Sequence, residues 1–221
     1  MKTITLHARL RNDDGFTLPD VIVSAIVGLI SLSIIATAIF TFTALQLRFA
    51  AVAGVTTAAA TIDTMLRQDL HEAITLRVQS AGSLTVTVNR NGACQEVAWW
   101  LEHTPNTDSL AIGTRACGTE TAADTTQYPL KPNTTGQFSY RNIGGRGITI
   151  ENGIMTLAAG TAPTTVPADN WASHTIGSVT LDVTLLGYFG AETIIHSTQQ
   201  TSPLSRLTRE PGTPTTFVGG S

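Results

Sequence analysis

Hydrophobic residues form one uninterrupted run near the start of the chain and alternate with polar residues over much of the rest. No charged residue occurs between Val21 and Leu47. As a helix, this run of roughly 27 residues would extend about 40 Å, whereas the hydrocarbon core of a bilayer is about 30 Å thick. The run therefore predicts a membrane-spanning helix over about 21–47.

The helical pattern continues past Arg48 and becomes one-sided. Asp63 and Arg67 are four residues apart on the polar side, where we expect them to pair. Apolar residues recur on the other side at steps of three and four; they are Ile62, Met65, Leu66, Leu70, Ala73 and Ile74. The two patterns together predict one long helix over 16–78.

From residue 81 onward, the period changes from that of a helix to that of strands. Trp99 and Trp100 are adjacent, so in a strand their side chains point to opposite faces. Alternation predicts strands around 84–88, 97–101, 110–113, 148–150 and 179–185, with a last short strand at 194–195. Thr, Pro and Gly predict surface loops at 118–136 and 160–169 and a loose tail over 201–221. We therefore expect an α+β protein with a β-rich head over 81–200, mainly antiparallel.

The stretch Gly15-Phe16-Thr17-Leu18-Pro19-Asp20 follows a short polar leader and precedes the apolar run. This arrangement resembles the class III signal of type IV pilins and pseudopilins. The resemblance implies that a prepilin peptidase cuts between Gly15 and Phe16, which makes 1–15 a leader, and that Phe16 is then N-methylated. The family usually has Glu where this chain has Asp20, so the charge is kept and the reach is one methylene shorter.

A second, less specific resemblance covers 65–73, which is similar to the late helix of larger minor pilins and pseudopilins of the PilW-like or J-type group. It implies a long helix packed on a β head, in a structural subunit that acts in filament initiation or at the tip. The implied partners are the prepilin peptidase and N-methyltransferase, other major and minor pilins, the assembly platform, and the membrane before assembly.

An ionised Asp20 beside an apolar run needs a compensating charge. An α-amino group has an ordinary pKa near 8, so a new N-terminus at Phe16 is positive at neutral pH. We expect Asp20 to pair with the Phe16 amine of its own chain or of a neighbour, which would also set the register between subunits.

The charges at the start of the chain predict that the head lies outside the cytoplasm, which bears on the state of the cysteines. Lys2, Arg9 and Arg11 precede the apolar run and favour a cytoplasmic N-terminus. The only cysteines, Cys94 and Cys117, then lie in an oxidising compartment, where a disulfide is expected, two unpaired core cysteines being the alternative. The net charge of the whole chain is -3, which does not favour nucleic acid as a partner.

The sequence contains no recognisable catalytic or metal-binding motif. The five histidines are dispersed without metal-ligand spacing. The glycine-rich stretch 143–147 lacks the Lys and Ser/Thr of a phosphate loop, and there is no Gly-x-Ser-x-Gly motif. We therefore expect a protein that is not an enzyme and needs no cofactor.

Several alternatives remain open at this point. Within the filament class, the chain could be a pseudopilin of a type II secretion or competence system. Outside it, the chain could be a single-pass membrane-anchored adhesive or binding module that uses the loops 118–136 and 160–169. An ordinary secretory signal cut near Ala51-Val52-Ala53 is a further alternative.

Overall fold

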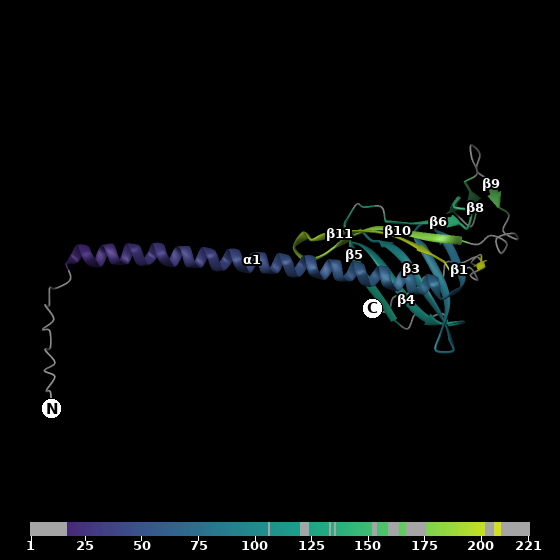
Figure 1. The fold of residues 1–221 in the computed structure, drawn as a ribbon, viewed down its shortest axis with the longest axis horizontal. Coiled ribbons are helices and arrows are strands. Elements are labelled where there is room, and N and C mark those ends of the chain that lie inside the picture. The colour runs from purple at the N-terminus through teal and green to yellow at the C-terminus, as the bar shows by residue number, and fades with distance from the viewer. Residues whose placement is uncertain are drawn as a thin grey trace, which may run out of the picture. The chain divides into compact units, whose positions relative to one another are not determined.

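A computed structural model describes most of the chain. The described residues are 17–105, 107–119, 124–132, 134, 136–151, 154–158, 164–166, 176–201 and 206–208. The chain divides into two compact units, with the boundary between Leu47 and Arg48. Figure 1 follows the order of the elements along the chain.

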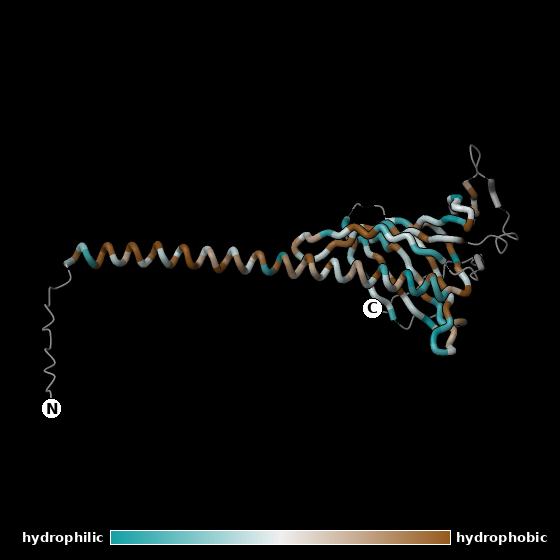
Figure 2. Tube along the Cα trace, in the orientation of Figure 1, coloured by the Kyte–Doolittle hydropathy of each residue, from teal (hydrophilic) through white to brown (hydrophobic). Residues whose placement is uncertain are grey.

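One helix, α1 (Leu18–His71), contributes to both units. Within the first unit, none of the described residues 17–47 is buried. Figure 2 shows this stretch as largely hydrophobic. By length and composition, α1 can cross a membrane, as the sequence predicts. An apolar surface of this extent is stable in lipid or against other apolar helices.

The part of α1 in the second unit packs on a sheet through one face. Ala51, Val55, Ile62, Leu66 and Leu70 are buried, most of them at steps of four residues. The last three have no exposed side-chain area. Burying each of these three side chains contributes about 1.5–3 kcal/mol, so the amphipathic face predicted from the sequence attaches α1 to the sheet.

The described strands form one 12-stranded sheet in the order β12-β1-β2-β3-β4-β5-β10-β6-β7-β8-β9, with β11 paired to β10. The described pairs are antiparallel except β1 with β12. The strands are β1 (Ala73–Ser80), β2 (Ser83–Arg90), β3 (Ala93–His103), β4 (Asp108–Ala116), β5 (Asp124–Leu130), β6 (Gln137–Asn142), β7 (Gly147–Glu151), β8 (Ile154–Leu157), β9 (Thr164–Val166), β10 (Ile176–Leu186), β11 (Glu192–Gln200) and β12 (Arg206–Thr208).

The sheet curls, which brings β6 back to the turn between β1 and β2. The Phe138 amide donates to the Ala81 carbonyl at 2.7 Å. The Tyr140 hydroxyl donates to the Ser83 carbonyl at 3.1 Å. The side chains on the concave face, including Leu84 and its register partner Trp99, are fully buried and form the core with α1.

The predicted fold class is confirmed: the protein is α+β, with a long N-terminal helix packed on a curled antiparallel sheet, the layout that the resemblance to pilins implied. The predicted boundary at 78 is wrong, because α1 ends at His71 and the next residues form β1. Ile74, Leu76 and Val78 alternate with polar residues, which is the pattern of a strand. This alternation determines the conformation of the segment, although Ala73 and Ile74 also continue the apolar spacing of the helix.

Four segments contain more strand than expected, and one of them is the predicted loose tail 201–221, which includes β12. The predicted loop 118–136 includes β5, and the predicted loop 160–169 includes β9. The strand expected at 194–195 extends over nine residues as β11. Threonine-rich segments such as 124–126 look like loops by composition, but β-branched threonine suits a strand when a partner such as β4 is available.

Candidate functional site

The start of α1 is organised by a reciprocal cap between Thr17 and Asp20. The Thr17 amide and hydroxyl both donate to Asp20 Oδ2, at 3.2 and 2.6 Å. In return, the Asp20 amide donates to the Thr17 carbonyl at 2.9 Å. This is half of a capping box: the carboxylate of Asp20, at the third helical position, accepts from the Thr17 amide, while the Asp20 amide bonds to the Thr17 main chain and not to its hydroxyl.

The cap fixes where the Asp20 carboxylate points. It is held at the positive end of the helix dipole and turned toward Thr17, the residue next to the predicted mature N-terminus. Gly15 and Phe16 lie outside the described residues, so the predicted cleavage site, the methylation and the Asp20–Phe16 pair stay predictions. The hydrogen bonds between Thr17 and Asp20 were not predicted, although the spacing of the two residues matches the signature of a capping box.

The hydroxyl groups of the apolar run are satisfied within α1. The Thr37 hydroxyl donates to the Ser33 carbonyl and the Thr41 hydroxyl to the Thr37 carbonyl, each at 2.8 Å. Ser31 makes the same contact to Val27 at 2.9 Å. A hydroxyl bonded to its own helix costs little to place in lipid, so these residues do not conflict with a membrane-spanning segment.

A buried charged cluster attaches the last turns of α1 to the sheet. Asp69 is 2% exposed and accepts hydrogen bonds from Arg90 and from the Trp99 indole N–H, the latter at 2.9 Å. Arg90 Nε also donates to Glu72 at 3.0 Å. Burial raises the pKa of the Asp69 carboxyl, while Trp99 and Arg90 act in the opposite direction. Hydrogen bonds from Gln68 and Arg90 lower the pKa of Glu72.

A second contact joins α1 to β11. The Gln199 amide donates to Asp63 Oδ1 at 2.9 Å, and the Ser197 hydroxyl donates to the same oxygen. The predicted Asp63–Arg67 pair does not occur among the described ion pairs. The carboxylate is turned toward the sheet instead, where it meets buried Ser197 and half-buried Gln199, while Arg67 is exposed.

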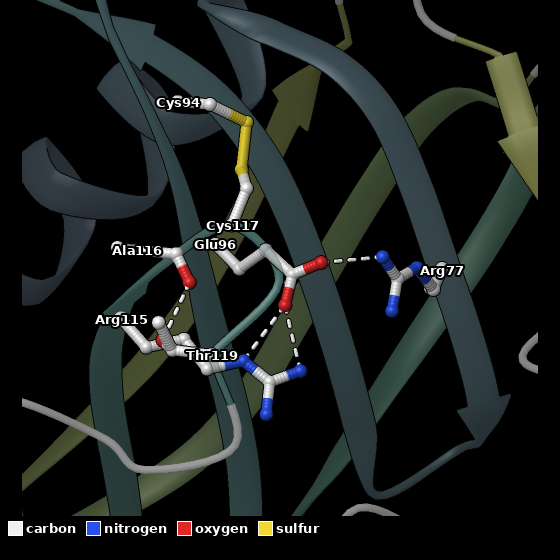
Figure 3. The surroundings of a disulfide bond; sticks show 7 residues. All are labelled: Arg77, Cys94, Glu96, Arg115, Ala116, Cys117 and Thr119. Carbon is white, nitrogen blue, oxygen red and sulfur yellow. Dashed lines mark hydrogen bonds and ion pairs between the residues drawn. A yellow bond between two sulfur atoms is a disulfide. The ribbon is translucent and has the colours of Figure 1, made fainter.

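The predicted disulfide between Cys94 and Cys117 is present, and the two Cα atoms are 5.5 Å apart. Figure 3 shows Glu96 beside it, between Arg77 and Arg115. Arg115 Nε donates to Glu96 Oε2 at 2.7 Å, and Arg77 donates to the other carboxylate oxygen. These contacts give a buried carboxylate two cationic partners, so the region is a structural cross-link between β1, β3 and β4.

In the part of the chain that the structure describes, no group of three or more His, Cys, Asp or Glu side chains could hold a metal ion. His103 lies 2.9 Å from Asp108 across neighbouring strands, and His196 contacts Asp182. Both histidine side chains are exposed. His7 and His174 lie outside the described residues, as do parts of the loops 118–136 and 160–169.

No protein-family model, curated protein or solved structure matches this chain. Its function is therefore inferred from its own residues and their geometry. The features that bear most directly on function are a capped carboxylate at the start of α1, an exposed apolar helix behind it, and a disulfide-linked head firmly attached to the same helix.

Proposed function

We propose that this protein is a structural minor subunit of a type IV pilus or a related filament, processed by prepilin peptidase and acting in filament initiation or at the tip. The observation that carries the proposal is the position of Asp20, a carboxylate at the third residue of a helix that stays apolar and exposed up to Leu47. A charge is expensive there and is retained in membrane helices for a function.

The chemistry of assembly follows from this position. The helix holds the subunit in the membrane until the leader is removed between Gly15 and Phe16. The new Phe16 amine is positive, and N-methylation keeps the charge. In the filament, Asp20 pairs with a Phe16 amine, which offsets the cost of burying the carboxylate among apolar helices and fixes the axial register. Because Thr17 already orients the carboxylate, little ordering is needed when the pair forms.

The mature N-terminus is the first test. Intact-mass and N-terminal peptide spectrometry of the protein from its native cell should find a chain that begins at Phe16, with or without an added methyl group. A chain that begins at Met1 favours a membrane-anchored binding module. A chain that begins near Gly54 means a secreted domain.

The second test separates the charge of Asp20 from its capping role. We expect Asp20→Ala and Asp20→Asn to block incorporation into filaments, and Asp20→Glu to retain it, while the head stays folded in all three. Asn keeps an acceptor oxygen for Thr17 but has no charge, so it is the matched control for the cap. Normal incorporation of Asp20→Asn would exclude the charge pair, and normal incorporation of all three would contradict the proposal.

Co-purification addresses which filament is involved. The subunit should be recovered with other small pilin-like proteins when filaments are sheared from cells, at low abundance for a minor subunit. Recovery only with a secretion apparatus would instead favour the pseudopilin alternative, which shares the same signal and helix.

A further inference from the structure

The exposed aromatic side chains of the second unit gather at one end of it. Phe49 is 72% exposed, Tyr188 85% and Phe189 72%. The other aromatic residues described in this unit are buried or half-buried; they are Trp99, Trp100, Tyr128, Phe138 and Tyr140. Large exposed aromatic groups on a folded domain mark an interaction surface when they occur together.

Tyr188 and Phe189 form the tip of the turn between β10 and β11, and this turn lies against α1 (Figure 1). The Gly187 amide donates to the Ala191 carbonyl at 2.7 Å and closes the turn. A Cβ added at Gly187 would lie 3.1 Å from Val55 Cβ, so the turn and the helix are in close contact.

This end of the unit is where α1 emerges from the sheet. Ala51 is the first buried helix residue, three positions after Arg48, the first charge beyond the apolar run. At about 1.5 Å per residue, Arg48 and Ala51 are separated by about 4.5 Å along the helix axis. Phe49 lies between them. The aromatic side chains therefore lie near the level at which the lipid-compatible part of α1 ends.

The backbone of the tip holds Phe189 in a conformation that bulky residues rarely adopt. Phe189 has φ 55° and ψ 26°, in the left-handed region, and Gly190 follows with φ 72°. A bulky residue in that region is strained, and glycine or asparagine would fit the same turn more easily. Such strain is found where a side chain serves an interaction and the surrounding structure holds it in place.

We propose that Phe49, Tyr188 and Phe189, here called the aromatic tip, contact the headgroup region of the phospholipid bilayer while α1 spans it. Tyr is enriched at this depth because it combines an apolar ring with a hydroxyl group, and exposed Phe side chains bury apolar area at the boundary between headgroups and acyl chains. Arg48, on the same end of the unit, can pair with lipid phosphates. The aromatic tip gives the head a second contact with the membrane besides α1, which sets its depth and limits its rotation.

The inference rests on the membrane-spanning part of the proposed function and not on filament assembly. Its test uses the full-length protein in vesicles of phosphatidylcholine and phosphatidylglycerol, with an environment-sensitive fluorophore on one introduced cysteine at a time. Phe189→Cys reports the tip. Ile143→Cys is the matched control, because Ile143 is also 72% exposed. Thr37→Cys reports insertion of α1.

Ile143 lies at the opposite end of β10 from the tip. A Cβ on Gly177 would be 2.8 Å from Ile143 Cα, and Gly177 is ten residues from Gly187. Ten residues of strand extend about 33 Å. The two labelled positions therefore differ in their place on the head while matching in exposure.

We expect brominated lipids to quench most of the emission at positions 189 and 37 and little at position 143, and aqueous iodide to do the reverse. Quenching by lipid at 37 with iodide access at 189 would overturn the inference and leave the membrane anchor intact. No lipid quenching at 37 would overturn both. Shielding of 189 only in assembled filaments would assign the tip to a neighbouring subunit. Phe189→Trp, paired with Ile143→Trp, repeats the measurement without a new thiol.

Discussion

Single carboxylates determine how α1 is attached to the head. Asp63 and Asp69 both point toward the sheet, and each meets polar side chains that the sheet supplies. In the sequence they look like ordinary polar positions of an amphipathic helix, because the residues that satisfy them come from distant strands. The helical spacing predicted which face is apolar, but only the fold brings Arg90 and Trp99 to Asp69.

Removing the Asp69 carboxylate should destabilise the head strongly. Asp69→Ala leaves the Trp99 indole N–H without its acceptor and Arg90 with only an exposed partner, so the free energy of unfolding should fall by about 2–4 kcal/mol. Glu72→Ala removes the other, exposed carboxylate from the same Arg90 and should cost less than about 1 kcal/mol. Urea unfolding of the full-length protein in detergent, followed by tryptophan emission, measures both. Equal losses would contradict the role given to Asp69.

Tyr140 predicts an alkaline limit to stability. Burial raises the pKa of its phenol far above the ordinary value near 10. Above about pH 10 the unfolded chain therefore releases this proton while the folded chain keeps it, so stability falls as the pH rises. The full contribution is present below that pH. The decrease reaches about 1.4 kcal/mol per pH unit.

The comparison of wild type with Tyr140→Phe isolates that proton. Unfolding free energies measured at about pH 8 and about pH 11 should decline more steeply in the wild type, since the variant has no phenol to ionise. At the lower pH the variant should be less stable by about 1 kcal/mol, because its hydrogen bond to the Ser83 carbonyl is lost. Parallel declines would show that Tyr140 ionises at the same pH in the folded and unfolded chains, which would contradict the raised pKa.

At the scale of elements, local pattern and tertiary pairing agreed for some strands and disagreed for other segments. Strands 84–88, 97–101 and 179–185 were predicted within β2, β3 and β10, because apolar and polar residues alternate there on a half-buried sheet. The end of α1 and the strand β5 were not predicted. In β5 most residues are exposed, so no buried face imposes a readable alternation. Its conformation is set by pairing with β4.

The disulfide joins β3 to the residue directly after β4, and the two residues are already hydrogen-bonded, since the Cys117 amide donates to the Cys94 carbonyl at 3.2 Å. Its main effect is therefore to restrict the unfolded chain. For a sequence separation of 23 residues, the double substitution Cys94→Ser with Cys117→Ser should lower the free energy of unfolding by about 3 kcal/mol. Urea unfolding of the variant and of reduced wild type should agree. An unchanged midpoint would mean that the bridge adds no stability.

At the scale of the whole molecule, the sequence was most informative about the apolar run and the carboxylate before it, because few environments suit them. A charge-free run of this length has to avoid water, and the capped Asp20 before it is costly without a partner. Those two features support both the membrane-spanning segment and the filament proposal. The aromatic tip was not predictable, because Phe49 and Phe189 are 140 positions apart in sequence and the fold brings the turn of Phe189 to α1 through the contact of Gly187 with Val55.

The distribution of buried residues along α1 has a mechanical consequence. They extend from Ala51 to Leu70, about 28 Å of helix axis, and the hydrogen bond of Asp69 with Trp99 attaches the far end to the sheet. A force along the helix axis would act on all these contacts at once, as a shear force. It could not break them one after another. A head attached in this way is suited to a fibre under tension, because the contacts that hold it to the helix extend over five turns.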